Sequence, residues 1–282
     1  MTFGQCIQIY KKKFIHKRKC TNKVIIFDLD ETLGCFTDLE ALWSVIDKNA
    51  IPYNDMYHTK QLLFNALLDL YPEFLRYGIL NILEYLNYKK SIGHFIGIYL
   101  YTNNQVSKTW SKYITNYLDY KISTSGLFKQ IVYAFKINKR IVEPLRKSNT
   151  KTYSDFIRCS LLPRNTEMCF IDNTYYTKMH HNKVYYIQPK PFFHGMKTGD
   201  IIQRLMESRI LKINDDKIFT SHFLDNNLIT SVEKSQKYID EDTYVSRKLL
   251  YHIQDFFLLT TRNKRTRKNK TLNIGNFTRK NK

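Results

Sequence analysis

The stretch Val24-Ile25-Ile26-Phe27-Asp28-Leu29-Asp30-Glu31-Thr32 decides which fold the chain adopts. Its first four residues are apolar and mostly β-branched, a pattern typical of a buried strand. Two carboxylates follow at Asp28 and Asp30, and side chains two residues apart in an extended chain project to the same side. We therefore predict a buried strand that ends in a pair of adjacent carboxylates.

The sequence up to about residue 210 continues with apolar runs that alternate with amphipathic segments. The apolar runs predict strands over 95–101, 131–135, 168–171 and 184–187. Apolar side chains at helical spacing predict helices over most of 37–72 and over 78–88, 105–118, 153–161 and 201–210. This alternation is typical of an α/β domain with a mostly parallel central sheet, in which ligands bind beyond the carboxyl ends of the strands.

The two ends of the chain differ from this middle part in composition. Of the net charge of +20, residues 1–27 contribute seven Lys and Arg and residues 256–282 contribute nine, and neither end contains an acidic residue. The remaining 29 basic and 25 acidic residues nearly balance. We predict a basic lead-in over 1–21, an α/β domain over 22–210, an extension over 211–260 with a helix near its end, and a disordered basic tail over 261–282.

Two interpretations of the basic ends stay open. In the first, these runs of like charge are only solvated and have no binding role. In the second, they hold nucleic acid, anionic membrane surfaces or acidic proteins in a non-specific way.

Cysteine content and hydropathy bear on the compartment. The five cysteines form no Cys-x-x-Cys pair, so that neither a disulfide framework nor a zinc site is expected. The most apolar run, over 95–101, is far shorter than the roughly 20 residues of a transmembrane helix. We expect a soluble intracellular protein, in the cytoplasm or the nucleus, without a transmembrane segment.

Polar residues follow two of the other predicted strands. Thr102 and Asn103 come after the strand over 95–101, and Asp172 and Asn173 come after the strand over 168–171. A hydroxyl near a helix start can donate to a phosphate oxygen, and carboxylate and amide oxygens are ligands that Mg²⁺ accepts. The structural alternatives are a helix cap at Thr102 or Asn103 and ordinary turn chemistry at Asp172.

Phosphoryl transfer would give a role to each of the two carboxylates that follow the first strand. One of Asp28 and Asp30 can attack a phosphoryl group to form an aspartyl phosphate, and the other can act as the acid and base. A cation between them would offset their mutual repulsion. A lysine is also required to neutralise the phosphate, and Lys151, just before the helix over 153–161, is the candidate, with Lys147 as a competitor.

Taken together, these residues resemble the four motifs of the haloacid dehalogenase superfamily. Asp28-x-Asp30-x-Thr32 is followed in the family's order by Thr102, Lys151 and Asp172. The resemblance implies a Rossmann-like core. The helical segment over 37–72 falls outside the resemblance, and we expect it to be an insertion, or lid, after the first strand.

One branch of the superfamily is more similar still, the NLI-interacting-factor-like proteins, which include phosphatases of the RNA polymerase II carboxy-terminal domain. That branch favours Asp-Leu-Asp-Glu-Thr-Leu, found here at 28–33, and Asp-Asn after apolar residues, found at 172–173. The resemblance covers about residues 22–190. The lysine-rich tail is also similar to that of versions encoded by large DNA viruses.

The resemblance implies a Mg²⁺-dependent phosphatase, most simply one that acts on phosphoserine or phosphothreonine in proteins. Asp28 would be the nucleophile and a metal ligand, and Asp30 would be the acid and base and bind the metal through its main-chain carbonyl. The remaining roles would be phosphate binding by Thr102, Asn103 and Lys151, and completion of the Mg²⁺ site by Asp172 and Asn173.

Some positions depart from the branch. Arg76-Tyr77-Gly78 stands where the branch has Arg-Pro-Gly, and Thr174-Tyr175-Tyr176 stands where small residues or a proline are common. The insertion with which the branch recognises its substrate is not recognisable, which puts phosphoserine specificity in doubt. His180 and His181, near the last motif, are predicted to lie in a surface loop and not to contact the substrate.

Two further functions remain as alternatives. The same chemistry would serve a phosphatase of nucleotides or of nucleic-acid ends, for which the basic ends are the motive. The other alternative is a non-catalytic protein of the same fold that binds nucleic acid through its tails. The presence of both Asp28 and Asp30 argues against this alternative.

Overall fold

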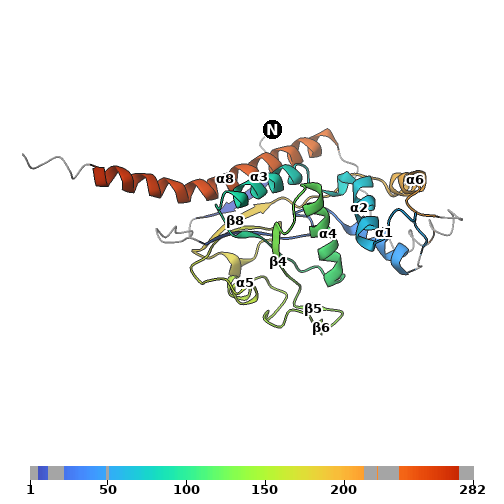
Figure 1. Ribbon diagram of the computed structural model, residues 1–282, viewed down its shortest axis with the longest axis horizontal. Coiled ribbons are helices and arrows are strands. Elements are labelled where there is room, and N and C mark those ends of the chain that lie inside the picture. The colour runs from blue at the N-terminus through green and yellow to red at the C-terminus, as the bar shows by residue number, and fades with distance from the viewer. Residues whose placement is uncertain (1–5, 12–21, 49–50, 213–220, 222–234, 273–282) are drawn as a thin grey trace, which may run out of the picture.

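Six strands form one sheet in the computed structural model, which describes residues 6–11, 22–48, 51–212, 221 and 235–272 (Figure 1). In spatial order the strands are β1 (Ile7–Tyr10), β8 (Val184–Pro189), β7 (Glu167–Ile171), β2 (Lys23–Phe27), β3 (Gly97–Tyr101) and β4 (Phe128–Val132). All neighbours are parallel except β1, which runs antiparallel to β8. The predicted α/β fold with a mostly parallel sheet is confirmed, and the arrangement is compatible with a Rossmann-like fold.

The strand β2 lies in the middle of the sheet, between β7 and β3. Its last residue, Phe27, is level with Ile171 of β7 and Leu100 of β3. These parallel strands therefore end at the same edge, which we call the carboxyl edge, and begin at the opposite, amino edge. The register brings the residues that follow β2, β3 and β7 together, although about 70 residues separate each strand from the next in the sequence.

Helices cover both faces of the sheet, and alternate residues of β2 show this directly. Ile25 and Phe27 belong to a large apolar cluster, whereas Val24 and Ile26 belong to a smaller one. The large cluster takes in α1 (Thr37–Lys48), α2 (Lys60–Leu70), α3 (Ile79–Ser91), α4 (Lys108–Lys121), α6 (Thr198–Ser208) and α8 (Gln236–Leu272). The smaller cluster takes in α5 (Tyr153–Ser160), which lies on the other side of the sheet from α3 and α8 (Figure 1).

The helices predicted for 37–72 are present as α1 and α2, followed by a short 3₁₀ helix, η1 (Pro72–Phe74). Their buried side chains, such as Leu42 and Leu67, join the same apolar cluster as the sheet and α4. That this insertion covers the candidate site stays a prediction. A second 3₁₀ helix, η2 (Thr177–Met179), follows β7.

Several elements differ from the sequence-based expectation. The lead-in contains β1, and the strand expected over 131–135 lies at 128–132 and is followed by a hairpin of β5 (Lys136–Ile137) and β6 (Arg140–Ile141). The edge strand β1 is only four residues long and gains its stability from pairing with β8, so local pattern does not reveal it. The α8 helix continues through 261–272, where we expected disorder, and the last ten residues lie outside the described part.

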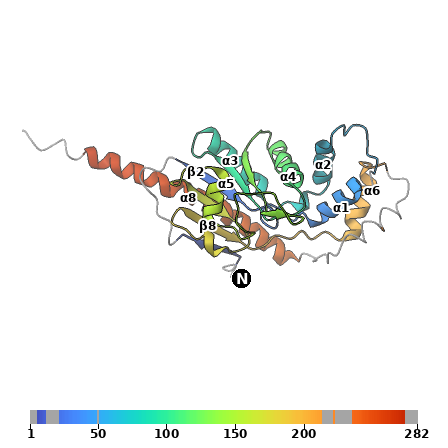
Figure 2. The ribbon, with the colours of Figure 1, turned by 90° about the horizontal axis from the view of Figure 1, so that it is seen from below.

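The α8 helix runs across the large cluster from one edge of the sheet to the other (Figures 1 and 2). Near its start, Glu241 lies 2.5 Å from Lys190 Nζ, just beyond the carboxyl end of β8. Further along, Asp255 Oδ2 lies 3.0 Å from Lys11 Nζ and accepts a hydrogen bond from Tyr185, near the amino end of β8. No helix of the described residues combines the length and apolarity that crossing a membrane requires.

The contact between α3 and α8 can be tested at Gly78, which has a φ of +68° and precedes α3. A Cβ there would lie 2.2 Å from Ser246 Oγ of α8, whereas a Cβ at Gly93, with a φ of +71°, would meet open space. We expect Gly93→Ala to lower the free energy of unfolding by about 1–2 kcal/mol, through backbone conformation alone. Gly78→Ala should lower it by roughly 1–3 kcal/mol more, because the Ser246 hydroxyl must leave its place and the Ser246 Cβ, 3.3 Å away, leaves little room. Urea unfolding measures both, and equal losses would show that α8 does not pack there.

Candidate active site

A buried lysine joins two carboxylates at the carboxyl edge of the sheet. Lys151 Nζ lies 2.5 Å from Asp28 Oδ1, after β2, and 2.7 Å from Asp172 Oδ2, after β7. The side chains of Lys151 and Asp172 are 1% and 0% exposed, and that of Asp28 is 13% exposed. Three segments that are far apart in the sequence therefore meet at one point, and Asp28 is the member that solvent can reach.

Of the two candidate lysines, Lys151 is the one at this point, since Lys147 is exposed. Lys151 stands two residues before α5, whose first turn is capped by the Thr152 hydroxyl, which accepts a hydrogen bond from Asp155 N at 3.0 Å. Burial alone would lower the pKa of Lys151, but the charges of Asp172 and Asp28 outweigh it and raise the pKa above its ordinary value. The lysine is therefore a permanent cation.

The loop after β2 turns sharply and presents the second carboxylate of the pair. The chain continues the sheet at Asp28, whose N–H donates to Ile171 O, and then turns at Glu31, which has a φ of +57°. Asp30 Oδ2 accepts a hydrogen bond of 3.0 Å from Asn104 Nδ2, in the loop after β3. The two carboxylates thus have different partners, a lysine for Asp28 and an amide for Asp30.

Arg76 holds the loop after β2 in place through hydrogen bonds to its main-chain carbonyls. Its Nε donates to Thr32 O at 2.6 Å, and its Nη2 donates to Glu31 O at 2.5 Å and to Lys190 O at 2.8 Å. Burial lowers the pKa of Arg76 to about 10, so that the guanidinium stays charged at neutral pH. In the sequence, Arg76 stood out only as part of Arg76-Tyr77-Gly78, which departs from the Arg-Pro-Gly of the branch at Tyr77. The structure gives this arginine a role, because its guanidinium donates to three main-chain carbonyls.

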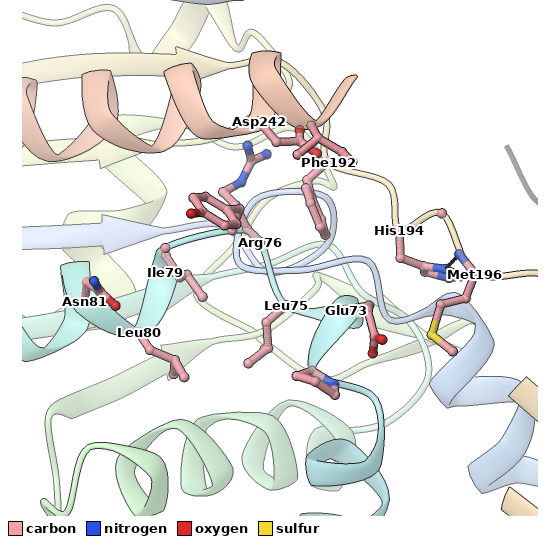
Figure 3. A pocket seen from close by; sticks show the side chains of 15 residues that line it. Glu73, Leu75, Arg76, Ile79, Leu80, Asn81, Phe192, His194, Met196 and Asp242 are labelled. Atoms are coloured by element: carbon pink, nitrogen blue, oxygen red, sulfur yellow. Dashed lines mark hydrogen bonds between the residues drawn. The ribbon is translucent and has the colours of Figure 1, made fainter. Parts of the chain in front are cut away.

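A mainly apolar cavity of about 600 Å³ lies on the other side of Arg76 (Figure 3). Its walls include Ile79 of α3, Phe192 and Met196 after β8, and Ile239 of α8. The cavity-lining residues include none of the residues predicted for the site. Arg76 is therefore shared between this cavity and the loop that carries the carboxylates, and the cavity itself is not part of the carboxylate cluster.

The segment after β3 is fixed by a second buried arginine, Arg146. Its Nη1 donates to Thr102 O at 2.9 Å and to Tyr133 O at 2.7 Å, and its Nη2 donates to Asn103 Oδ1 at 2.7 Å and to Asn149 O at 3.0 Å. Sequence reasoning missed Arg146, because an arginine in a polar loop carries no periodic signal. It also missed the contact of Asn104 with Asp30.

The interpretation of Thr102 or Asn103 as a helix cap is wrong. The α4 helix begins at Lys108, and its cap is Ser107, whose hydroxyl accepts from Trp110 N at 3.0 Å. The Thr102 hydroxyl instead accepts from Asn104 N at 2.9 Å at the carboxyl edge, and the Asn103 amide donates to Tyr176 OH at 3.0 Å. Both residues therefore belong to the loop after β3, which contacts the carboxylate of Asp30 through Asn104.

Asn173 is the predicted site residue with the most hydrogen bonds to its neighbours. Its Oδ1 accepts from the Thr32 hydroxyl at 2.9 Å, its Nδ2 donates to Glu31 Oε2 at 3.0 Å, and its main-chain N–H donates to the Thr32 hydroxyl at 3.1 Å. These bonds tie the loop after β7 to the loop after β2. The Asp172 Oδ1 accepts from Thr174 N, which is the turn chemistry expected as an alternative, while its Oδ2 faces Lys151.

The histidines near this motif have partners in the same surface region. His181 stacks on Tyr153, with ring centroids 3.8 Å apart, and its Nδ1 accepts from Lys183 N. The His180 ring lies edge-on to Tyr10 of β1.

Three carboxylates, those of Asp28, Asp30 and Asp172, lie near one ammonium, and the imbalance of charge shows in the pKa values of Asp30 and Asp172. Burial and the charge of Asp28 raise the pKa of Asp30 to about 6. The same two causes raise the pKa of Asp172 to about 7, although Lys151 opposes them. The cluster therefore holds more negative charge than Lys151 compensates, and either protons or a further cation would relieve it.

The donor set fits Mg²⁺. Carboxylate oxygens of Asp28 and Asp172 and the main-chain carbonyl of Asp30 are hard ligands, and Mg²⁺ typically takes one or two carboxylates and keeps several waters. Among the described residues, no group of three or more His, Cys, Asp or Glu side chains is placed to hold a metal ion. The side-chain oxygen of Asn173 already accepts from Thr32, so that this residue would join only through its remaining lone pair.

Arg146 should contribute strongly to stability. We expect Arg146→Met to lower the free energy of unfolding by at least about 3 kcal/mol, because the carbonyls that it serves lose their buried donor. Lys147→Met is the matched control, and because Lys147 is exposed we expect a change within about 0.5 kcal/mol. Chemical denaturation of both variants tests this, and similar losses would contradict the role of Arg146.

The raised carboxyl pKa values predict a pH dependence for the metal-free protein. Between the ordinary value of 3.8 and the folded values of about 6 and 7, the folded state binds more protons at Asp30 and Asp172 than the unfolded state. The stability should therefore fall as the pH rises from about 4 to 7. Denaturation in EDTA across this range measures the slope, and Asp172→Asn should reduce it. A stability that rises with pH and is unaffected by Asp172→Asn would contradict the charge imbalance.

We compared the chain with models of protein families, with curated proteins and with solved structures, and none of them matched.

Proposed function

We propose that the chain is a Mg²⁺-dependent phosphatase of the haloacid dehalogenase type, and that it acts through an aspartyl phosphate on Asp28. The observation that carries the proposal is the contact of Lys151 with both Asp28 and Asp172 at the carboxyl edge. The strand order supports it as well, because Asp28 follows the central strand β2 and the motifs of Thr102 and Asp172 follow the strands on either side, β3 and β7.

Each residue of the cluster has a task in the proposed reaction. The exposed oxygen of Asp28 attacks the phosphorus of a phosphate monoester, while Asp30 protonates the leaving oxygen as its bond to phosphorus breaks. A pKa of about 6 keeps part of Asp30 protonated near neutral pH, as an acid catalyst requires. Water then attacks the phosphorus, Asp30 takes its proton, and the release of phosphate restores the Asp28 carboxylate.

The remaining residues would bind the group that is transferred. Lys151 and Thr102 would neutralise and hold the phosphate oxygens, and Asn103 would assist. When bound by Asp28, Asp172 and the Asp30 carbonyl, with Asn173 beside them, Mg²⁺ would supply charge neutralisation for the phosphate and the nucleophile. Arg76 and Arg146 act indirectly, because they hold the two loops and touch neither Asp28 nor Lys151.

For the substrate we propose a phosphoprotein, following the branch that the motifs resemble. The basic ends of the chain were the motive for nucleotides or nucleic-acid ends. Residues 1–5 and 12–21 of the basic lead-in lie outside the described part, and α8 approaches the carboxyl edge with its start and not with its basic end. No observation therefore favours nucleic-acid ends as the substrate. The intact set of Asp28, Asp30 and Lys151 likewise speaks against a protein that has lost catalysis.

Asp28→Asn tests the nucleophile. We expect Mg²⁺-dependent hydrolysis of p-nitrophenyl phosphate to fall on the order of a thousand-fold or more, because an amide cannot form the aspartyl phosphate. Asp55→Asn is the control, since Asp55 is exposed, and it should leave the rate unchanged. Mg²⁺ should also raise the melting temperature of the unmodified chain and of Asp55→Asn. The increase should be smaller for Asp28→Asn.

The outcomes separate the parts of the proposal. Hydrolysis that survives Asp28→Asn would exclude Asp28 as the nucleophile. A screen of phosphopeptides, nucleotides and phosphorylated oligonucleotides, with and without Mg²⁺, tests the substrate class. Absence of turnover on all of them, with Mg²⁺ binding retained, would favour the non-catalytic alternative.

A further inference from the structure

The last part of α8 has an unusual composition. Residues 260–271, which we call the basic arm, consist only of Thr, Asn, Lys and Arg, and six of these twelve residues are Lys or Arg. The last acidic residue before the arm is Asp255, which pairs with Lys11. The arm therefore carries six positive charges and contains no carboxylate within its own sequence to offset them.

The fold carries the arm away from the candidate active site. The α8 helix packs on the body as far as Leu259. The Phe257 ring lies 5.6 Å from that of Phe95, just before β3 begins at the amino edge. Beyond this point α8 extends past the other elements, and both views agree on this (Figures 1 and 2). The candidate site lies at the opposite, carboxyl edge, so that the arm and the site face different surroundings.

Helix geometry distributes the charge of the arm around its axis. Successive residues of an α-helix are rotated by about 100°, so the six basic positions are spread over all sides of the helix. They are Arg262, Lys264, Arg265, Arg267, Lys268 and Lys270. A helix that lies on a membrane needs an apolar face to bury, and the arm contains no apolar residue. A flat anionic surface would also meet only one side of it.

A groove of a nucleic-acid duplex provides negative charge on both sides of a helix. The major groove of B-DNA is wide enough for an α-helix and is bordered by phosphates along both strands. Twelve helical residues span about 18 Å, which is the length of roughly five base pairs. Like charges that repel one another in the free helix would each find a phosphate there.

We propose that the basic arm binds double-stranded DNA through its phosphates, without base specificity, and anchors the protein with its candidate active site directed away from the duplex. The proposal does not depend on the phosphatase assignment. Six phosphate contacts predict that the logarithm of the affinity falls with the logarithm of the salt concentration with a slope of about −5. Between 50 and 200 mM salt the affinity should therefore fall about a thousand-fold.

Two triple variants of the full chain with equal loss of charge test the location. In the arm, Arg265→Gln, Arg267→Gln and Lys268→Gln remove three charges; on the exposed hairpin of β5 and β6, Lys136→Gln, Lys139→Gln and Arg140→Gln remove the same number. Fluorescence anisotropy with labelled 20-base-pair DNA and RNA duplexes gives the affinity at several salt concentrations. We expect the arm variant to lose about a hundred-fold in affinity at 150 mM salt and the hairpin variant to lose less than about three-fold.

Further measurements complete the test. Lys264→Arg, Lys268→Arg and Lys270→Arg, which keep the charge of the arm, should leave the affinity unchanged, and circular dichroism should confirm that all variants are folded. Equal losses for the two triple variants would overturn the proposal, because net charge and not the arm would then be responsible. Failure to bind the DNA duplex, tighter binding to the RNA duplex than to the DNA duplex, or tighter binding to phosphatidylserine vesicles would overturn it as well.

Discussion

The ammonium of Lys151, buried between the carboxylates of Asp28 and Asp172, is the interaction on which the rest of the site depends. Lys151 is 123 residues from Asp28 and 21 residues from Asp172 in the sequence, so local structure cannot bring them together. Burial would favour the neutral amine, and only the two carboxylates keep the charge in place. The positions of β2, β7 and the start of α5 are therefore constrained by one another.

Two buried arginines extend this constraint to loops that have no regular structure. Arg76 donates to the carbonyls of Glu31 and Thr32, and Arg146 donates to those of Thr102 and Tyr133. A loop normally exposes its carbonyls to water, but a loop beside a buried charge cluster must satisfy them internally. A guanidinium has five donors in a fixed plane and can serve several carbonyls at once, which a lysine at the same place would not do.

The α8 helix contacts both the carboxyl edge and the amino edge of the sheet. It begins near Lys190, whose carbonyl also binds Arg76, and it reaches Lys11 and Phe95 at the amino edge. The proposed catalytic chemistry and the proposed nucleic-acid contact thus lie at opposite ends of one helix. Such an arrangement would place the enzyme on a large anionic support and leave its site open to a different molecule.

The sequence by itself determined the buried strand before Asp28, the alternation of strands and helices, and the order in which polar residues follow the strands. These depend on local periodicity, which reports burial directly. Only the tertiary structure decided between Lys151 and Lys147, paired β1 with β8, brought Asn104 to Asp30 and gave Arg146 its carbonyls. The partner of a buried charge or of an edge strand lies far away in the sequence, and it becomes defined only when the sheet register aligns the strand ends.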